Sequence, residues 1–224
     1  MIWREITLLS IPCRILAALV LSGIIGMERG LKNRAAGFRT YMLVCIGSCM
    51  IMMINQFSYQ STGLGDPVRM GAQVISGIGF LGAGSIIVTT HNQIKGLTTA
   101  AGLWTSACIG LSLGFGMYEI ALVGGIAIFL TLTLLHKWEN RMRRNAKVLT
   151  VYIELNAGFG LSDFLQTARE LALDVSNIQL ESDNSSAHNA VCFVITVRGK
   201  ERLKHDALLT MLHGMPCVRY LEEL

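Results

Sequence analysis

The chain has 224 residues, of which 52% are hydrophobic and 15% are charged, and its formal net charge at pH 7 is +4. Its mean hydropathy is +0.49. This composition excludes an ordinary soluble protein of this length and predicts an integral membrane protein.

Five apolar stretches are long enough to cross a hydrocarbon core of roughly 30 Å at about 1.5 Å per residue. They cover residues 8–27, 41–57, 70–88, 97–115 and 118–136. The first follows Arg4 and so resembles a signal peptide, but no A-x-A cleavage pattern follows it, and we interpret it as a retained span. The sequence therefore predicts an α-helical bundle of five transmembrane helices, with the termini on opposite sides of the membrane.

The distribution of lysine and arginine predicts the orientation of these spans. The first-to-second and third-to-fourth connections, together with the segment after the fifth span, carry Arg29, Lys32, Arg34, Arg39, Lys95, Lys137, Arg141, Arg143, Arg144 and Lys147. The other side carries only Arg4, Arg14 and Arg69. Under the positive-inside rule the C-terminus is cytoplasmic and the N-terminus lies outside.

The third stretch, residues 70–88, is unusually rich in glycine. Gly77, Gly79, Gly82 and Gly84 remove side chains from more than one face, which lets neighbouring helices approach from several directions. We therefore predict that this helix occupies the centre of the bundle. The same stretch contains the motif G-x-G-x-x-G of dinucleotide-binding proteins. That motif requires a preceding strand, and because these glycines lie within an uninterrupted apolar run, we exclude a dinucleotide site.

The apolar region also contains a weak internal repeat. Residues 35–40 and 100–105 read Ala-Ala-Gly-Phe-Arg-Thr and Ala-Ala-Gly-Leu-Trp-Thr, and Cys-Ile-Gly recurs at 45–47 and 108–110. Both units enter the membrane from the same side, which is typical of a parallel repeat about an axis along the membrane normal. Chance similarity between spans rich in alanine and glycine is the alternative.

Charged groups near the inner ends of the spans need partners, because isolated charges at membrane depth are costly. Glu28 and Arg29 end the first span, and Arg39 and Thr40 open the second. We predict an ion pair between Glu28 and Arg39 that ties these ends together, either as a structural clasp or as part of a functional site.

A second polar group lies at the outer side. Asp66 followed by Pro67 is typical of a helix start, and Arg69 and Gln73 follow it along the third span. Arg14, about two turns into the first span, either snorkels outward or pairs with Asp66. Capping and snorkelling explain these residues without a function. The alternative is an outer vestibule in which Asp66 attracts a cation.

Few groups in the spans suit a metal or a reaction. Thr98 and Thr99 are candidate functional hydroxyls, although interhelical hydrogen bonding is their commonest use. A divalent-cation path requires several carboxylate or carbonyl oxygens, and the six cysteines and five histidines are dispersed without metal-ligand spacing. We therefore expect no metal site and no cofactor. No nucleophile–base pair or phosphate loop is present, so we expect no enzymatic activity and no nucleic-acid partner.

The chain changes character after a transmembrane domain at residues 1–137. Residues 138–147 form a basic connector, and residues 148–224 have the patterning of a small cytoplasmic α+β domain. The patterning predicts strands at 149–155, 175–180, 190–197 and 217–221, helices at 161–173 and 201–213, a turn at 183–186, and Ser162 and Asp163 as helix caps. The order β-α-β-β-α-β is the ferredoxin-like arrangement.

Four segments of this chain resemble the MgtC/SapB family of bacterial inner-membrane proteins. They are Gly26-Met-Glu28-Arg29, Ala36-Gly-Phe-Arg39-Thr40, the glycine-rich run from Ala72 to Gly84, and Lys95-Gly-Leu-Thr-Thr-Ala-Ala101. The family pattern is matched at Glu28, Arg39, Asp66, Arg69 and Gln73. Thr98 stands where virulence-linked members carry Asn. The resemblance also implies that the cytoplasmic domain is ACT-like.

The resemblance implies a plasma-membrane protein for growth under magnesium limitation and, in pathogens, for virulence inside macrophages. It favours a regulator that affects ATP synthase, membrane potential and cation balance. From the residues themselves, we expect a homodimer in the lipid bilayer that acts through protein contacts. A transporter or channel for Mg²⁺ or another cation is the alternative, and a sensor whose soluble domain binds a small ligand is a third possibility.

Overall fold

The computed structural model describes residues 5–89, 93–135, 137–138, 141–142, 148–171, 173–181, 191–199 and 205–223. The chain divides into two compact units, Met1–His136 and Lys137–Leu224. The first unit is helical, and the second is built on an antiparallel sheet.

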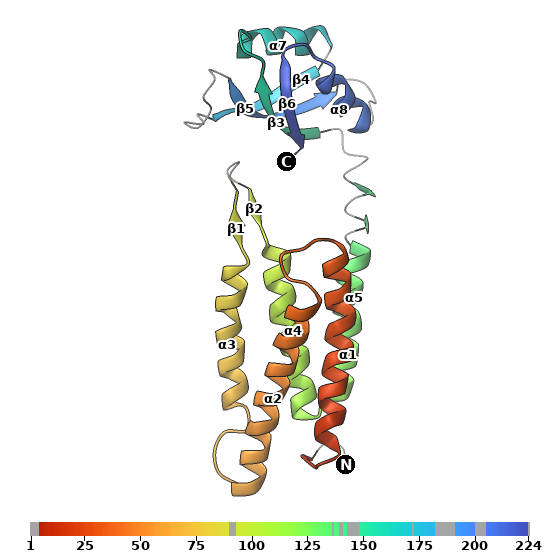
Figure 1. The fold of residues 1–224 in the computed structure, drawn as a ribbon, viewed down its shortest axis with the longest axis vertical. Coiled ribbons are helices and arrows are strands. Elements are labelled where there is room, and N and C mark those ends of the chain that lie inside the picture. Colours follow the sequence, from red (N-terminus) through yellow and green to blue (C-terminus); the bar gives the residue numbers. More distant parts are fainter. Residues whose placement is uncertain are drawn as a thin grey trace. The chain divides into compact units, whose positions relative to one another are not determined.

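In its described residues, the helical unit contains five helices that run alongside one another (Figure 1). They are α1 (Ser10–Leu31), α2 (Phe38–Thr62), α3 (Arg69–Gly84), α4 (Leu97–Phe115) and α5 (Tyr118–Leu130), the last continued by the π-helical segment η2 (Thr131–Leu135). Among the described residues, α1, α2, α4 and α5 with η2 are long and apolar enough to cross a membrane. These four correspond to the first, second, fourth and fifth predicted spans.

The third predicted span is only partly helical. Helix α3 has 16 residues, about 24 Å at 1.5 Å per residue, and ends at Gly84 instead of Val88. The chain then turns and forms strand β1 (Ile87–Val88), which pairs with β2 (Ile94–Lys95) in a short hairpin. The run from Ile86 to Val88 is β-branched, which favours extended backbone. The prediction of helix through residue 88 is therefore wrong at its end.

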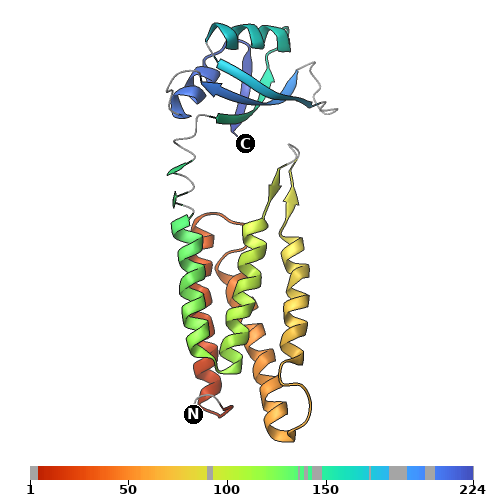
Figure 2. The same ribbon diagram turned by 180° about the vertical axis from the view of Figure 1, so that it is seen from behind.

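Helix α2, and not α3, lies at the centre of the bundle. It packs against both α1 and α4, while α3 lies at one edge in both views (Figures 1 and 2). Three glycines of α4 allow a close approach to α2: Gly102 meets the Tyr41 hydroxyl, Gly110 the carbonyl oxygen of Cys45, and Gly114 that of Cys49. Ser106 of α4 donates a hydrogen bond of 3.1 Å to the Tyr41 carbonyl oxygen.

The glycines of α3 have a different environment from the one predicted. Among the described residues, a Cβ atom added at Gly77, Gly79 or Gly84 would have no neighbour within 4 Å, whereas one at Gly82 would lie 3.5 Å from the Ala100 Cβ. The prediction that α3 is the central helix is therefore wrong for a single chain. A high glycine content indicates that a neighbouring helix can approach closely. It does not determine whether a neighbouring helix does so.

The arrangement of the first four helices is the one that a parallel repeat would produce. Helices α2 and α4 run in the same direction, and Tyr41 and Ser106, which hydrogen-bond across them, are 65 positions apart. Residues 35 and 100, which begin the two repeated segments, have the same separation. Helix α1 packs mainly on α2, and α3 mainly on α4.

The C-terminal unit has the predicted order of elements. It contains β3 (Val148–Leu155), α7 (Leu161–Glu170), β4 (Leu173–Glu181), β5 (Cys192–Gly199), α8 (His205–His213) and β6 (Val218–Glu223). The strands form an antiparallel sheet in the order β4-β5-β3-β6. The predicted turn at residues 183–186 and the first four residues of the predicted second helix lie outside the described residues.

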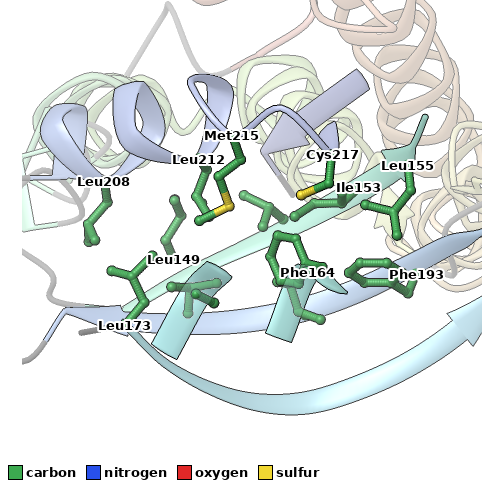
Figure 3. Close-up of a cluster of buried hydrophobic side chains, with 14 residues drawn as sticks. Leu149, Ile153, Leu155, Phe164, Leu173, Phe193, Leu208, Leu212, Met215 and Cys217 are labelled. Atoms are coloured by element: carbon green, nitrogen blue, oxygen red, sulfur yellow. The ribbon is translucent and has the colours of Figure 1, made fainter. Parts of the chain in front are cut away.

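The core of this unit lies between the sheet and its two helices (Figure 3). Alternate residues of β3, from Leu149 to Leu155, are buried against Phe164 of α7 and Leu212 of α8. The Phe164 and Phe193 rings meet edge to face at 5.3 Å. Helix α7 ends three residues before the predicted end, because Leu173 already belongs to the sheet.

The start of α7 agrees in part with the predicted caps. The carboxylate of Asp163 accepts a hydrogen bond of 2.7 Å from the backbone N–H of Gly160, the N-cap residue. Asp163 therefore caps the helix from its third position, while the N-cap itself is glycine.

Candidate functional site

A buried polar cluster lies at the end of the helical unit where α1 ends and α2 and α4 begin, which we call the hairpin end. Glu28 and Arg29 belong to the last turns of α1, and their side chains are only 13% and 4% exposed. Glu28 forms an ion pair with Lys32, the C-cap residue of α1, and lies 3.8 Å from the Arg29 guanidinium. A charged pair four residues apart faces one side of a helix, which explains the choice of Lys32.

The predicted ion pair between Glu28 and Arg39 is absent from the described residues. Arg39 is exposed at the start of α2, and Glu28 is paired within its own helix. The sequence separation of four residues between Glu28 and Lys32 makes that local pair easy to form, whereas Arg39 would have to fold back across the connection.

Tyr41 completes the cluster from α2. Its side chain is fully buried, its hydroxyl lies against Gly102 of α4, and Arg29 and Glu28 are within electrostatic range. Among the described residues, two buried atoms of this cluster have no hydrogen-bond partner: Glu28 Oε2 and Arg29 Nε. Tyr41 is not among the residues predicted from the sequence to be functional. The repeat, which places residues 65 positions apart on facing helices, was the signal that linked α2 to α4.

The N-termini of α2 and α4 lie at this same hairpin end. The N-cap residues are Gly37 and Gly96, and neither first turn contains an acidic residue or a side-chain cap. The candidates Arg39 and Thr40 occupy the second and third positions of α2, and Thr98 and Thr99 occupy the same positions of α4. Thr99 is buried, and the other three are exposed.

The predicted outer residues do not form a common site in the described part of the chain. The Asp66 carboxylate accepts a 2.9 Å hydrogen bond from the Val68 N–H in the turn before α3. The N-cap of α3 is Val68 and has no side-chain cap, so the prediction that Asp66 and Pro67 start the helix is wrong. Asp66, Arg69 and Gln73 are all exposed. The residue that positions this segment is Asn55 of α2, which is 6% exposed and hydrogen-bonds to the backbone of Pro67 and Met70.

Asn55 was missed by the sequence analysis, although an amide inside an apolar stretch was an available signal. A buried amide in a membrane helix requires a partner, and the backbone at the start of the next helix supplies one. This contact determines where α3 begins relative to α2.

Arg14 neither snorkels outward nor pairs with Asp66. Its side chain is fully buried at the end of the unit opposite the hairpin end. The guanidinium donates hydrogen bonds to the Gly114 carbonyl oxygen at 2.6 Å, to Gln56 Oε1 at 2.8 Å and to the Tyr118 hydroxyl at 3.2 Å. Arg14 thereby connects α1 to α2, α4 and α5, and both predicted roles are wrong.

Among the described residues, no group of three or more histidine, cysteine, aspartate or glutamate side chains lies close enough to hold a metal ion. The cysteines are dispersed over both units, and all except Cys13 are partly or fully buried. In the C-terminal unit, burial raises the pKa of the Cys217 thiol above its ordinary value, which makes it less reactive.

Comparison with known proteins identifies the family. Residues 15–141, which contain the hairpin-end cluster, match the sequence model of the MgtC family. The chain belongs to the MgtC family. It is 34% identical over 213 residues to YhiD of Escherichia coli strain K12, whose name describes a candidate magnesium transporter, with 92% of this chain and 94% of the relative covered.

Other relatives of this MgtC-family chain carry two further names. It is 35% identical over 224 residues to the protein MgtC of Brucella abortus strain 2308, covering 96% of this chain and 90% of the relative. It is 36% identical over 123 residues to the protein SapB of Bacillus subtilis strain 168, with 53% of each chain covered. No solved structure matches the chain. The predicted MgtC/SapB family is therefore confirmed.

Proposed function

We propose that this MgtC-family membrane protein acts in magnesium homeostasis as a regulator, through contacts between α3 and another membrane protein. The observation that carries the proposal is the outward face of α3. Gln73, Gly77 and Gly84 are spaced four and seven residues apart, so they share one helical face, and all three are exposed. The opposite face, with Gly71, Ile78 and Gly82, packs inside the chain.

The exposed face of α3 suits a protein neighbour better than lipid. Glycines without a neighbour allow a second helix backbone to approach closely, as they do on α4. Gln73 and Ser76 add an amide and a hydroxyl that hydrocarbon cannot satisfy, and such groups commonly bond across helices. A face that combines both features supports docking to a transmembrane helix of a partner.

Leucine at Gly77 and Gly84 tests this proposal. Because neither glycine has a neighbour within 4 Å, we expect G77L and G84L to fold as stably as the parent chain. Co-purification of partners from native membranes should fall by at least ~10-fold, since the added side chains hold a partner backbone away. Gly124 of α5 also has open space around it, and G124L is the matched control. Unchanged co-purification by G77L and G84L would contradict the proposal.

The identity of the partner belongs to the same proposal. A homodimer and ATP synthase are the partners favoured by the sequence analysis, and the same pull-down distinguishes them. A chain carrying a second tag would be recovered in the first case, and ATP synthase subunits in the second. If neither is recovered and another membrane protein is enriched, the proposal that α3 docks to a membrane protein would stand, with that protein as the partner.

Transport of Mg²⁺ or another cation is the second candidate function. The name of the Escherichia coli relative and the exposed carboxylate of Asp66, just before α3, motivate it. Purified protein in liposomes should then pass the ion, and D66N should reduce the flux. Absence of flux for all common cations would remove this candidate.

The proposal also includes the topology of the chain in the membrane. We propose five crossings of the bacterial inner membrane, with α3 and β1 together providing the third, an outside N-terminus and a cytoplasmic ACT-like domain without enzymatic activity. The sixteen helical residues of α3 cover about 24 Å and the two residues of β1 about 7 Å, together enough for a hydrocarbon core of roughly 30 Å. Cysteine accessibility at Ser61 and Lys95 tests the orientation: Ser61→Cys should react from outside and Lys95→Cys only after permeabilisation.

A further inference from the structure

The N-termini of α2 and α4 present uncommitted hydrogen-bond donors at the hairpin end. The first bonds within these helices run from the Tyr41 N–H to the Gly37 carbonyl oxygen and from the Ala100 N–H to the Gly96 carbonyl oxygen. In the described part of the chain, the N–H groups of the first three residues of each helix have no acceptor. Glycine N-caps supply no side-chain oxygen, so both helix ends keep their donors and their positive dipole end free.

The two helix ends are close because α2 and α4 are parallel and in contact. Gly110 meets the Cys45 carbonyl oxygen, and Ser106 donates to that of Tyr41. This register places the start of α4 about one turn beyond the start of α2. Thr99, on the same face of α4 as Ser106, therefore lies on the side toward α2.

An independent observation comes from the buried cluster of α1. Only 4% of the Arg29 side chain is exposed, yet its Nε–H has no hydrogen-bond partner in the part of the chain that the structure describes. The guanidinium lies against Tyr41, in the first turns of α2. Leaving this buried donor unpaired costs about 1–3 kcal/mol, which favours an acceptor from outside the chain.

Charge at the hairpin end favours an anion. Among the described residues there, Glu28 is the acidic side chain, and it is already paired with Lys32. The basic side chains are Arg29, Lys32, Arg34, Arg39 and Lys95. Helix N-termini flanked by arginine and threonine hydroxyls are suited to phosphoryl oxygens, which accept several hydrogen bonds at once.

We propose that the hairpin end binds a phosphoryl oxyanion at the uncapped N-termini of α2 and α4, beside Arg29. The oxyanion belongs either to a lipid headgroup or to a free phosphate. This site gives Arg39, Thr40, Thr98 and Thr99 a common role, and it is separate from the α3 face.

Acidic substitutions at the helix starts provide the sharpest test. In T40D and T98D a carboxylate of the chain itself would occupy the N-terminal donors, so the oxyanion is excluded while the helix is stabilised or unchanged. T62D, at the exposed far end of α2, adds the same charge away from the site and is the matched control. R29Q removes the buried guanidinium, and its folding is checked by thermal unfolding.

Two ligand arms distinguish the sources. Inorganic phosphate is titrated into the purified full chain in neutral detergent, and native mass spectrometry counts phosphatidylglycerol retained from nanodiscs that also contain phosphatidylcholine. We expect T40D and T98D to weaken at least one of these interactions ~10-fold or more, about 1.4 kcal/mol, with T62D unchanged. Loss in the lipid arm alone assigns a headgroup, and loss in the phosphate arm alone assigns a free phosphate.

Three results would overturn the site. They are no binding in either arm, binding that T40D and T98D leave unchanged, and an equal loss in T62D, which would show only a general effect of charge. None of these results depends on partner recovery by α3, so failure here and failure of the proposed regulator role are separate outcomes.

Discussion

Two buried arginines lie at opposite ends of the helical unit, and they are satisfied in different ways. Arg14 is surrounded by carbonyl, amide and hydroxyl oxygens from three other helices. Arg29 has the Glu28 carboxylate at 3.8 Å and an unpaired Nε–H. The Arg14 guanidinium holds helices together through its several donors, while Arg29 keeps a donor that can bind a further acceptor.

Replacement of Arg14 by lysine should destabilise the helical unit by about 2–4 kcal/mol. An ammonium group cannot reproduce the planar fork, so acceptors on α2, α4 and α5 lose their donor in a buried site. Thermal or chemical unfolding in detergent measures the change. R69K, at an exposed position of α3, should shift stability by less than about 0.5 kcal/mol. Equal effects of the two substitutions would contradict this role for Arg14.

The element scale is dominated by the contact between α2 and α4. Gly102, Ser106, Gly110 and Gly114 recur at every fourth position of α4, so small residues form one continuous row along the helix. Along this row the α2 backbone comes close enough for α4 to touch the Cys45 and Cys49 carbonyl oxygens. Dispersion contacts between backbones replace the hydrophobic effect, which is absent between helices in lipid.

A pair of glycine-to-alanine substitutions separates packing from helix propensity. G110A would force a methyl group into the Cys45 carbonyl oxygen and should destabilise the bundle by about 1–3 kcal/mol. G77A meets no atom within 4 Å and should be neutral or stabilising by up to about 1 kcal/mol, because alanine favours helix. Unfolding of both variants in the same detergent gives the comparison. A larger loss of stability in G77A than in G110A would show that α3, and not α4, makes the closer helix contact.

For the whole molecule, the two units have separate hydrophobic cores. The core of the C-terminal unit is formed by residues of β3, α7, β5 and α8, with Phe164 and Phe193 fully buried at its middle. The core of the helical unit is formed by α1, α2, α4 and α5 residues. Each unit therefore contains the contacts that its own fold requires.

Residues 148–224 expressed alone should fold cooperatively in water. The expected result is a two-state urea transition, and F164A should lower the free energy of unfolding by about 3–5 kcal/mol, because it leaves a cavity in the core. Circular dichroism and fluorescence should give coincident transitions. An unfolded fragment would show that this core depends on the rest of the chain.

The sequence by itself determined the features that depend on local patterns. Runs of apolar residues identified the membrane class and four long helices, and two-residue and helical periodicities predicted the order β-α-β-β-α-β. Family motifs near Glu28 and Arg39 identified the family. These signals are local, since hydropathy and periodicity are properties of neighbouring residues.

Only the tertiary structure decided which of several possible contacts are made. Arg14 had solvent or Asp66 as possible partners, and the sequence could not tell the glycines of α3 from those of α4. Their choices depend on the register of α2 against α4 and on backbone carbonyls, which have no signature in the sequence. Close packing is a property of two surfaces at once, so the residues of one helix cannot specify it alone.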